Sequence, residues 1–499
     1  MKEWGQRVFF HPPPNNNNGD NMNGTDEQKA IWKEIEETDD HVIVNAGAGT
    51  GKTWTIVEGA KLVNGTAAFL AFNKSIATEL GKRLPDDVYT ATFHSLGFSA
   101  FRSNSPVKTK VNNNKVRDII EAKHGRVSFT FPLCKLISQM KGAMVEPSDR
   151  KSIMQLIDKY DIQFEEGDEV DAVRDIPRIM KECLGQLHHI DFDDMIWIPV
   201  KKDWPMSTYD VLFVDEAQDF NEMQRRLILK CVNGGRCIVV GDPNQAIYGF
   251  RGADSNSMDI FKEQLSNKDR KVSQFPLTLS WRCPTSVVNE ANRYVSNFHA
   301  KEDAQTGSVN VGAGFNPSNE DMVLCRYNAP LIGAFYDLIS QGKKARILGR
   351  EMSRGLSNMV KKISRDNSML MLEFTPLLTM DFKTTHAKLM NAEKIYQANG
   401  LEDRYDCLQV ISGNCTTVGD IHTQIKKLFV NKDEGVTLST VHKAKGLEAD
   451  NVYVLATERM PHPNASNIEE ERNICYVAIT RAKQNLYYCG PKPSGARYE

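Results

Sequence analysis

The chain has 499 residues, of which 40% are hydrophobic and 25% charged, and its formal net charge is −2. This composition is that of a soluble globular protein, and the length predicts about three or four domains. We find no apolar run that could span a bilayer and no signal segment, so we expect a soluble, cytoplasmic protein with no membrane partner. The net charge neither indicates nor excludes nucleic-acid binding, which would need a local groove. The ten cysteines lack CxxC or zinc-like spacing, which indicates free thiols in a reducing compartment.

The first 24 residues form a predicted tail ahead of the folded body. The segment at residues 11–24, HPPPNNNNGDNMNG, is rich in Pro, Asn and Gly and has almost nothing to bury, so we expect it to be disordered. Thr25 and Gln28 have the spacing of a capping box ahead of an apolar run. Order is therefore predicted to begin with a helix near Thr25.

The stretch VIVNAGAGTGKT, residues 42–53, has the layout of a phosphate-binding loop. A short apolar strand leads into a glycine-containing loop, and Lys52 and Thr53 then open a helix-like segment. Glycines let backbone N–H groups converge on phosphate oxygens, and the helix N-terminus adds partial positive charge. Lys52 can reach the β- and γ-phosphates of a nucleoside triphosphate, and the Thr53 hydroxyl can hold Mg²⁺. The candidate loop residues are Ala46, Gly47, Ala48, Gly49, Thr50, Gly51, Lys52 and Thr53, with the small Ala46 in place of the usual first glycine.

Further apolar stretches in the first half have the length of buried strands: Ala67–Phe72, Val88–Thr92, Tyr209–Val214 and Cys237–Val240. Residues 98–190 are mostly helix-like. The last two strands run into Asp215-Glu216 and Gly241-Asp242. Strands alternating with helices, with acidic residues at strand ends, indicate a parallel sheet that binds ligands at its carboxyl edge.

A second α/β block is predicted to begin near Leu277. Its clearest strands are Met322–Cys325 and Val452–Leu455. Residues 351–434 between them are polar and helix-like, with no obvious sheet. The sequence therefore predicts an α/β fold with two parallel-sheet blocks and mainly helical insertions.

Asp215 and Glu216 are natural partners of the phosphate-binding loop. The strand before them would deliver Asp215 to the Mg²⁺ shell and set Glu216 beside it, where it can orient and deprotonate an attacking water. A lone Asp-Glu pair after a strand is common at a protein surface, but here Gln218 and Asp219 follow directly. Gln245, after the next strand, is placed to sense a γ-phosphate.

Aromatic and basic side chains interleave just beyond this point, at Tyr248, Phe250 and Arg251. Such a mixture suits bases stacked in a single-stranded groove. The alternative is a Tyr and a Phe buried in a core beside a solvated Arg. From this segment alone, that alternative is favoured.

Nine segments, taken in order, resemble the motifs of the UvrD/Rep/PcrA type of superfamily 1 DNA helicase. They are AGAGTGKT, LAFNKSIA, TFHSLG, DFDDMI, FVDEAQD, VVGDPNQAIYGFRGAD, LSWRCP, VTLSTVHKAKGLEADNVYVL and EERNICYVAITRAKQNLY. Any one of them is moderately specific, whereas all nine in order are very specific. The resemblance covers roughly residues 25–490 and implies two RecA-like motor domains that use ATP and Mg²⁺.

The resemblance assigns roles at matching positions. Its catalytic positions fall on Lys52, Glu216, Gln245, Arg282 and Arg481, with the two arginines as fingers that stabilise charge on the transferred phosphoryl group. Its Mg²⁺ positions fall on Thr53 and Asp215, and its ribose contact falls on Glu448. Its DNA-groove positions fall on Phe72, Asn73, Thr92, His94, Tyr248, Phe250, Arg251 and His442. Because most arginines in any chain are solvated, the two fingers depend on motif position alone.

The nucleotide-base contacts leave alternatives open. Gln28 resembles the adenine-reading glutamine of the family, but it could equally be only the third residue of the capping box, and both can hold together. Trp54 stands where the family often has an Arg beside adenine, and Trp281 stands where a Tyr stacks on adenine. Two interpretations of Trp54 are equally open: adenine is held between the indoles of Trp54 and Trp281, or Trp54 packs in the core. In the DNA groove, Phe250 offers less stacking area than an indole, so the grip on each base should be weaker.

The resemblance also implies a domain plan. After a disordered tail at residues 1–24, the first RecA-like motor domain takes residues 25–97 and 191–276, with a helical insertion at 98–190. The second takes residues 277–350 and 435–499, with a short insertion at 351–434. The compact plan is similar to that of phage-encoded members, which places the protein in a bacterial or phage-infected cell.

We therefore expect an ATP-dependent DNA helicase that acts on single-stranded DNA and on single-strand/duplex junctions in replication, recombination or repair. A 3′→5′ polarity comes from the resemblance alone, and loading or replication and repair proteins are the expected partners. One alternative is a single-strand translocase that strips proteins or works within a repair or defence complex, with weak unwinding alone. Another alternative is a binding clamp whose ATPase activity is regulatory or lost. The intact Lys52, Asp215 and Glu216 count against this alternative.

Overall fold

The computed structural model describes residues 24–71, 73–160, 162, 164, 167–232, 234–249, 256–266, 270–391, 395–413, 415–429, 434–463, 465 and 467–497. The predicted tail, apart from Gly24, lies outside these residues, and so do the predicted groove residues Phe72, Phe250 and Arg251. The chain divides into two compact units, Met1–Ala46 with Gly51–Leu277 and Gly47–Thr50 with Thr278–Glu499.

The first unit is built on a six-stranded parallel sheet with the strand order β3-β2-β6-β7-β1-β8. Its strands are β1 (His41–Ala46), β2 (Ala67–Ala71), β3 (Val88–Thr92), β6 (Val211–Val214), β7 (Arg236–Gly241) and β8 (Val272–Leu277). β2, β6 and β7 are buried along their whole length. Burial on both faces explains why the sequence shows these strands as continuous apolar runs. The strand predicted at residues 209–214 is correct but begins two residues later.

Each face of this sheet has its own hydrophobic core. Val42, Val44 and Ala46 of β1 pack with α1 (Asp26–Glu37), α2 (Lys52–Gly59) and α3 (Lys74–Leu80). Ile43 faces the other way, toward α10 (Glu222–Cys231) and α11 (Ser257–Ser266). The predicted capping box is confirmed at the start of α1, where Gln28 N donates to Thr25 Oγ1 at 3.2 Å and Thr25 N donates to Gln28 Oε1 at 3.0 Å.

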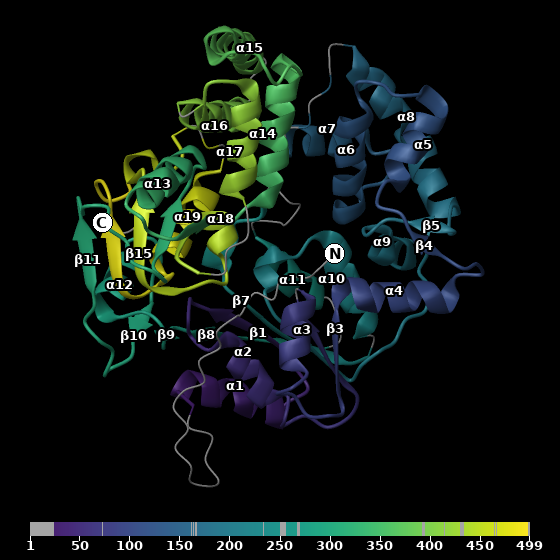
Figure 1. Cartoon of the computed structure of the whole chain (residues 1–499). Coiled ribbons are helices and arrows are strands. Elements are labelled where there is room, and N and C mark those ends of the chain that lie inside the picture. Colours follow the sequence, from purple (N-terminus) through teal and green to yellow (C-terminus); the bar gives the residue numbers. More distant parts are fainter. Residues whose placement is uncertain are drawn as a thin grey trace. The chain divides into compact units, whose positions relative to one another are not determined.

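A mostly helical insertion extends this second core. Its elements are α4 (Phe93–Asn104), β4 (Lys110–Val111), α5 (Lys115–His124), α6 (Thr130–Ala143), α7 (Arg150–Lys159), α8 (Asp168–Gly185), β5 (His189–Ile190) and α9 (Asp194–Lys201). In Figure 1, α5, α6, α7 and α8 gather into one bundle. Apolar residues of these helices, such as Leu136 and Ile176, belong to the same cluster as Leu70 and Val214 of the sheet. The insertion is therefore anchored to the sheet by a continuous core.

The second unit contains another six-stranded parallel sheet, with the order β11-β16-β15-β12-β14-β13. Its strands are β11 (Ser308–Val311), β12 (Met322–Cys325), β13 (Ala345–Ile347), β14 (Val436–Thr440), β15 (Ala449–Leu455) and β16 (Ala482–Tyr488). A short pair, β9 (Leu279–Ser280) and β10 (His299–Ala300), precedes it. Four helices of this half lie outside its helical insertion: α12 (Thr285–Ala291), α13 (Ala329–Ser340), α18 (Val441–Ala444) and α19 (Ile468–Ile479).

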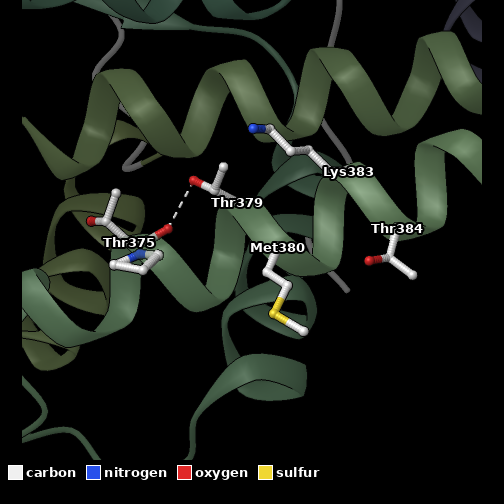
Figure 2. Close-up of a pocket in the computed structure, with 6 residues that line it drawn as sticks. Thr375, Thr379, Met380, Lys383 and Thr384 are labelled. Atoms are coloured by element: carbon white, nitrogen blue, oxygen red, sulfur yellow. Dashed lines mark hydrogen bonds between the residues drawn. The ribbon is translucent and has the colours of Figure 1, made fainter.

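The second sheet is also interrupted by helices, as predicted. They are α14 (Arg350–Ile363), α15 (Met371–Asn391), α16 (Ile395–Ser412) and α17 (Val418–Leu428). Apolar side chains are exposed on α15, where Leu372 is 86% and Met380 69% exposed. Figure 2 shows Met380 and Lys383 at a pocket on this helix, with the Thr379 hydroxyl bonded to the Thr375 carbonyl at 2.9 Å.

The predicted fold class is confirmed, because both halves are α/β with a parallel sheet and a helical insertion. All ten cysteines are free thiols. Among the described helices, none is long and apolar enough to cross a membrane.

Candidate active site

The carboxyl edge of the first sheet gathers the predicted Mg²⁺ ligands. α2 begins directly after Gly51, whose φ of 81° is readily adopted only without a side chain. Thr53 in its first turn donates a hydrogen bond from Oγ1 to Asp215 Oδ2 at 2.8 Å, although 162 residues separate them. Asp215 follows β6, and its other oxygen accepts from Glu216 N at 2.8 Å. The parallel sheet therefore brings together a hydroxyl and a carboxylate that the sequence placed far apart.

The side chain of Gln218 links Glu216 to the end of β7, the next strand. Gln218 Nε2 donates to Glu216 Oε2, and Gln218 Oε1 accepts from Asp242 N at 3.0 Å. Gln245 Nε2 in turn donates to Asp242 Oδ2 at 2.6 Å. Sequence reasoning gave Gln218 no role, although its place three residues after Asp215 was a usable signal. The network ties the candidate catalytic base to the candidate γ-phosphate sensor.

The backbone at Glu216 is itself unusual. Its φ is 59°, in the left-handed region that residues with a side chain seldom adopt. Such strained positions persist where surrounding contacts fix them, and they cluster at functional sites. Here the Gln218 amide supplies one fixing contact to the Glu216 carboxylate. The geometry is that of a carboxylate held in one orientation.

The electrostatics of the edge suit a divalent cation. Burial raises the pKa of Asp215 to about 6, and the neighbouring Glu216 adds to this, while Lys52 and the Thr53 hydrogen bond act in the opposite direction. A buried carboxylate beside a second carboxylate has an incomplete complement of positive charge. Its hard oxygen and the Thr53 hydroxyl fit Mg²⁺, which proteins often hold through one or two carboxylates together with substrate phosphates. No cluster of three or more His, Cys, Asp or Glu side chains in the described chain could hold a metal by itself.

Two of the three predicted base-binding residues, Gln28 and Trp54, lie on α1 and α2, whereas Trp281 lies in the second unit. Gln28 Nε2 donates to Thr55 Oγ1 at 3.1 Å, and Trp32 Nε1 donates to the Thr55 carbonyl at 2.8 Å. Trp54 is half-buried, and its ring meets Trp32 edge to face at 5.2 Å. The capping role of Gln28 is thus confirmed, whereas its role as an adenine reader stays a prediction. Trp54 packs partly into the protein and partly faces solvent, so both alternatives for it remain.

The tip of the phosphate-binding loop, Gly47–Thr50, belongs to the second unit. Within that unit, Ala48 N donates to Tyr476 Oη at 2.9 Å, and Gly49 O accepts from the backbone N of Trp281 at 2.9 Å. Gly49 has a φ of 69°, and a Cβ placed there would lie 2.5 Å from Arg282 Cβ. Only glycine fits this position.

The two candidate arginine fingers also lie in the second unit. Arg282 Nε is 2.6 Å from Glu448 Oε2, which pairs the predicted finger with the predicted ribose contact. Arg481 is buried and donates to the carbonyls of Val477 and Leu447 at 3.0 and 3.1 Å. Burial lowers the pKa of Arg481 to about 10, and repulsion from Arg282 adds to this. Two cations are therefore held close together at this site.

The predicted groove residues of the first unit lie at the ends of paired strands. Asn73 follows β2 and caps α3, with Oδ1 accepting from Ile76 N at 2.9 Å. Thr92 ends β3 and caps α4, with Oγ1 accepting from Ser95 N at 3.2 Å. β2 and β3 are neighbours, so both caps lie at the same sheet edge.

An aromatic side chain missed by sequence reasoning lies beside this edge. The ring of Phe192 meets His94 edge to face at 6.0 Å, and Phe192 is 52% exposed. A phenylalanine set among aspartates in DFDDMI was the available signal. Of the remaining groove predictions, Tyr248 is half-buried after β7, and His442 is half-buried on α18 of the second unit.

Comparisons with known proteins agree with these features. The UvrD/REP helicase N-terminal domain matches residues 26–266, and the UvrD-like helicase C-terminal domain matches residues 334–489. The F-box DNA helicase protein 1 of Schizosaccharomyces pombe is 24% identical over 93% of this chain and 57% of its own length. The F-box DNA helicase 1 of Gallus gallus is 25% identical over 93% of this chain and 48% of its own length. The ATP-dependent DNA helicase UvrD2 of Mycobacterium tuberculosis is 23% identical over 89% of this chain and 76% of its own length. The chain thus spans about half the length of the two F-box relatives.

Proposed function

The chain belongs to the UvrD/Rep/PcrA type of superfamily 1 helicases, and we propose that it is an ATP-dependent DNA helicase. We further propose that it moves along single-stranded DNA in the 3′→5′ direction and opens duplexes in replication, recombination or repair. The names of the relatives support a DNA helicase, and the polarity comes from the family resemblance.

The observation that carries the proposal is the hydrogen-bonded set at the carboxyl edge of the first sheet. Thr53 and Asp215 form one contact of this set, and the Gln218 side chain joins Glu216 to the strand end that holds Gln245. A structural polar cluster would be expected to neutralise its own carboxylates. Here burial and a second carboxylate raise the pKa of Asp215 instead. A site that is short of positive charge suits a Mg²⁺–triphosphate.

We assign each side chain a task in ATP hydrolysis. Thr53 and Asp215 hold Mg²⁺, which when bound neutralises charge on the phosphates. Lys52, at the start of α2, binds the β- and γ-phosphates. Glu216 orients the attacking water and accepts its proton, with Gln218 fixing the carboxylate. Gln245 senses the γ-phosphate.

Arg282 and Arg481 are assigned to the charge that develops on the transferred phosphoryl group. An arginine finger typically contributes about 10³–10⁵ in rate. Both guanidinium groups are fixed by protein contacts, Arg282 by Glu448 and Arg481 by backbone carbonyls. Arg481, held by neutral carbonyls, needs little rearrangement during the reaction.

A second function is supported by the compact second insertion. In the described chain it consists of the four helices α14–α17. With so small an insertion, the motor could run along single strands and strip bound proteins, alone or within a larger complex, while unwinding duplexes weakly.

The test measures ATP hydrolysis and strand displacement with the same protein. We expect phosphate release to rise strongly with single-stranded DNA at low salt and to fall as salt weakens the phosphate contacts. A partial duplex with a 3′ tail should be unwound, and one with a 5′ tail should not. Lys52→Ala is the control that removes hydrolysis. Equal rates with and without DNA would contradict the proposal, and displacement of streptavidin without unwinding would favour the translocase.

A further inference from the structure

One short loop in the second unit holds both candidate arginine fingers. The loop lies between α18 and β15, and Gly446 within it has a φ of 85°. The Leu447 carbonyl accepts from Arg481 Nη1 at 3.1 Å. The next residue, Glu448, places Oε2 2.6 Å from Arg282 Nε. This loop therefore contacts both guanidinium groups.

The two arginines are held in different ways. Arg481 donates to the neutral oxygens of Val477, Leu447 and Thr480, so no anion has to leave before it can act. Arg282 instead contacts a carboxylate. The side chains of Glu448 and Arg282 are 7% and 20% exposed, so water screens this ion pair only weakly. Separating the two leaves a buried charge without its partner, unless another anion takes the place of the carboxylate.

We propose that Glu448 is a positioning residue that holds Arg282 before nucleotide binds, and that the γ-phosphate of a bound triphosphate replaces its carboxylate on Arg282. This inference rests on the proposed ATPase function. The guanidinium binds carboxylates and phosphates through the same planar donors, so the exchange conserves the contact. The role differs from the ribose contact that the family resemblance assigns to Glu448.

The exchange has a measurable consequence for affinity. If opening the Glu448–Arg282 pair precedes full binding, the apparent affinity for a triphosphate is reduced by the fraction of molecules in which the pair is open. A diphosphate has no γ-phosphate to receive Arg282, and its affinity should not depend on this pair. The carboxylate thus tunes binding of ATP but not of ADP.

The test compares Glu448→Gln with the wild type by calorimetry, using Mg²⁺ with either ADP or the non-hydrolysable triphosphate AMP-PNP. The amide keeps the shape of the side chain and removes its charge. We expect AMP-PNP to bind about fivefold or more tightly to the variant, and ADP to bind equally to both proteins. Glu290→Gln is the matched control, because Glu290 is a buried glutamate of this unit paired with Arg293 at 2.7 Å, and it should change neither affinity.

Repeating the comparison in an Arg282→Gln variant separates the two possible roles of Glu448, as a positioning residue for Arg282 and as a ribose contact. In Arg282→Gln, adding Glu448→Gln should have no further effect on AMP-PNP binding, since the pair is already absent. Weaker binding of both nucleotides to Glu448→Gln would identify a ribose contact and overturn the inference. Unchanged binding of both nucleotides would also overturn it.

The remaining outcomes are equally informative. If Glu448→Gln does not fold, Glu448→Asp should give a smaller change in the same direction, and no change there overturns the inference. A wild-type chain that binds neither nucleotide would refute the proposed function, and the inference with it. If the wild type hydrolyses ATP and the Glu448 variants bind both nucleotides as the wild type does, the inference is refuted and the proposed function stands.

Discussion

Two clusters of buried charge in the first unit use similar residues and reach opposite electrostatic states. Within the helical insertion, Lys141 Nζ lies 2.6 Å from Asp191 and 2.8 Å from Asp194, and Lys115 Nζ lies 2.6 Å from Asp194. Burial alone would lower the pKa of Lys141, but the carboxylates of Asp194 and Asp191 raise it above its ordinary value. In this cluster each lysine contacts a carboxylate directly, so the protein supplies its own counter-charges.

At the carboxyl edge of the sheet the balance is different. Asp215 and Glu216 are neighbours, and burial together with Glu216 raises the pKa of Asp215 to about 6. Lys52 acts on Asp215 through space and only partly offsets these effects. The difference teaches which buried charges serve structure and which await a ligand. A self-neutralising set stabilises the fold, whereas a set of like charges has capacity for an ion of opposite sign.

The second unit shows the same principle with reversed sign. Arg282 and Arg481 repel each other, and burial lowers the pKa of Arg481 to about 10. One carboxylate, Glu448, contacts Arg282. This arrangement favours an anionic ligand, whereas the first favours a cation.

The largest expected effect tests the site that lacks counter-charge. Glu216→Gln should lower ATP turnover by about 10²–10⁴-fold, because the amide keeps the shape of the side chain and cannot accept the proton of water. Nucleotide binding should persist, whereas Lys52→Ala should lose turnover and triphosphate affinity together. Steady-state phosphate release and equilibrium binding of AMP-PNP provide the measurements.

Glu58→Gln is the matched control for this experiment. Glu58 lies in the last turn of α2, at the opposite end of that helix from Lys52, and it pairs with Lys61 at 2.7 Å. Its variant should hydrolyse ATP at the wild-type rate. Near-normal phosphate release by Glu216→Gln would show that another group is the base.

The next effect is on stability and concerns the self-neutralising cluster. Lys141→Met leaves Asp191 without its lysine in a buried site, and we expect a loss of about 3–5 kcal/mol in the free energy of unfolding. ADP affinity of the folded protein should not change. Urea denaturation followed by circular dichroism checks the first result, and calorimetry checks the second.

A double variant sharpens this prediction. Adding Asp191→Asn to Lys141→Met removes the unpaired charge and should recover part of the lost stability. A loss below about 1 kcal/mol for the single variant would mean that the cluster is not a source of stability.

The third prediction uses the raised pKa of Asp215. Removing the charge of Asp215 should raise the stability of the fold, whereas removing the charge of Lys141 should lower it. Without metal, the wild-type carboxyl is almost fully protonated in both the folded and the unfolded state at about pH 3, so it carries no penalty there. As pH rises toward about 6, the unfolded chain ionises first, and the folded protein loses stability relative to Asp215→Asn. At pH 7 the variant should therefore be more stable by about 1–3 kcal/mol.

Melting temperatures of the two proteins between about pH 3 and pH 8, with and without Mg²⁺, measure this difference. It should be near zero at about pH 3, grow until about pH 6 and then stay level. Mg²⁺ should raise the melting temperature of the wild type and leave that of Asp215→Asn unchanged. A wild type that is more stable than the variant at pH 7 without Mg²⁺ would contradict the charge imbalance.

Much of the fold could be predicted from the sequence, because its signals are local. Continuous apolar runs such as Val211–Val214 form strands covered on both faces. The capping box of Thr25 and Gln28 depends only on spacing. The contact between Thr53 and Asp215 was also predicted in outline, since the carboxyl ends of parallel strands meet at one edge.

What could not be predicted depends on side-chain partners across the fold. No spacing rule pairs Arg282 with Glu448, which are 166 positions apart in the chain and meet only through the second fold unit. Gln218 links two strand ends next to Glu216, whose φ is positive, and a positive φ at a non-glycine residue leaves no trace in the sequence. The burial of Lys115 and Lys141 likewise leaves no local mark in the sequence. Motifs predict which residues are functional, whereas packing decides what each one touches.

The smallest expected effect asks whether the self-neutralising cluster also serves the DNA groove. Asp191 and Asp194 flank Phe192, so the ion pairs that fix the two aspartates also fix an exposed ring beside His94. One base stacked on an aromatic ring contributes about 1–3 kcal/mol. Phe192→Ala should therefore weaken binding of single-stranded DNA about tenfold, as measured by fluorescence anisotropy at fixed salt. Phe131→Ala, which removes a ring on α6 that is 73% exposed, is the matched control and should bind DNA like the wild type. Equal DNA affinity of both variants would leave the cluster with a role in stability alone.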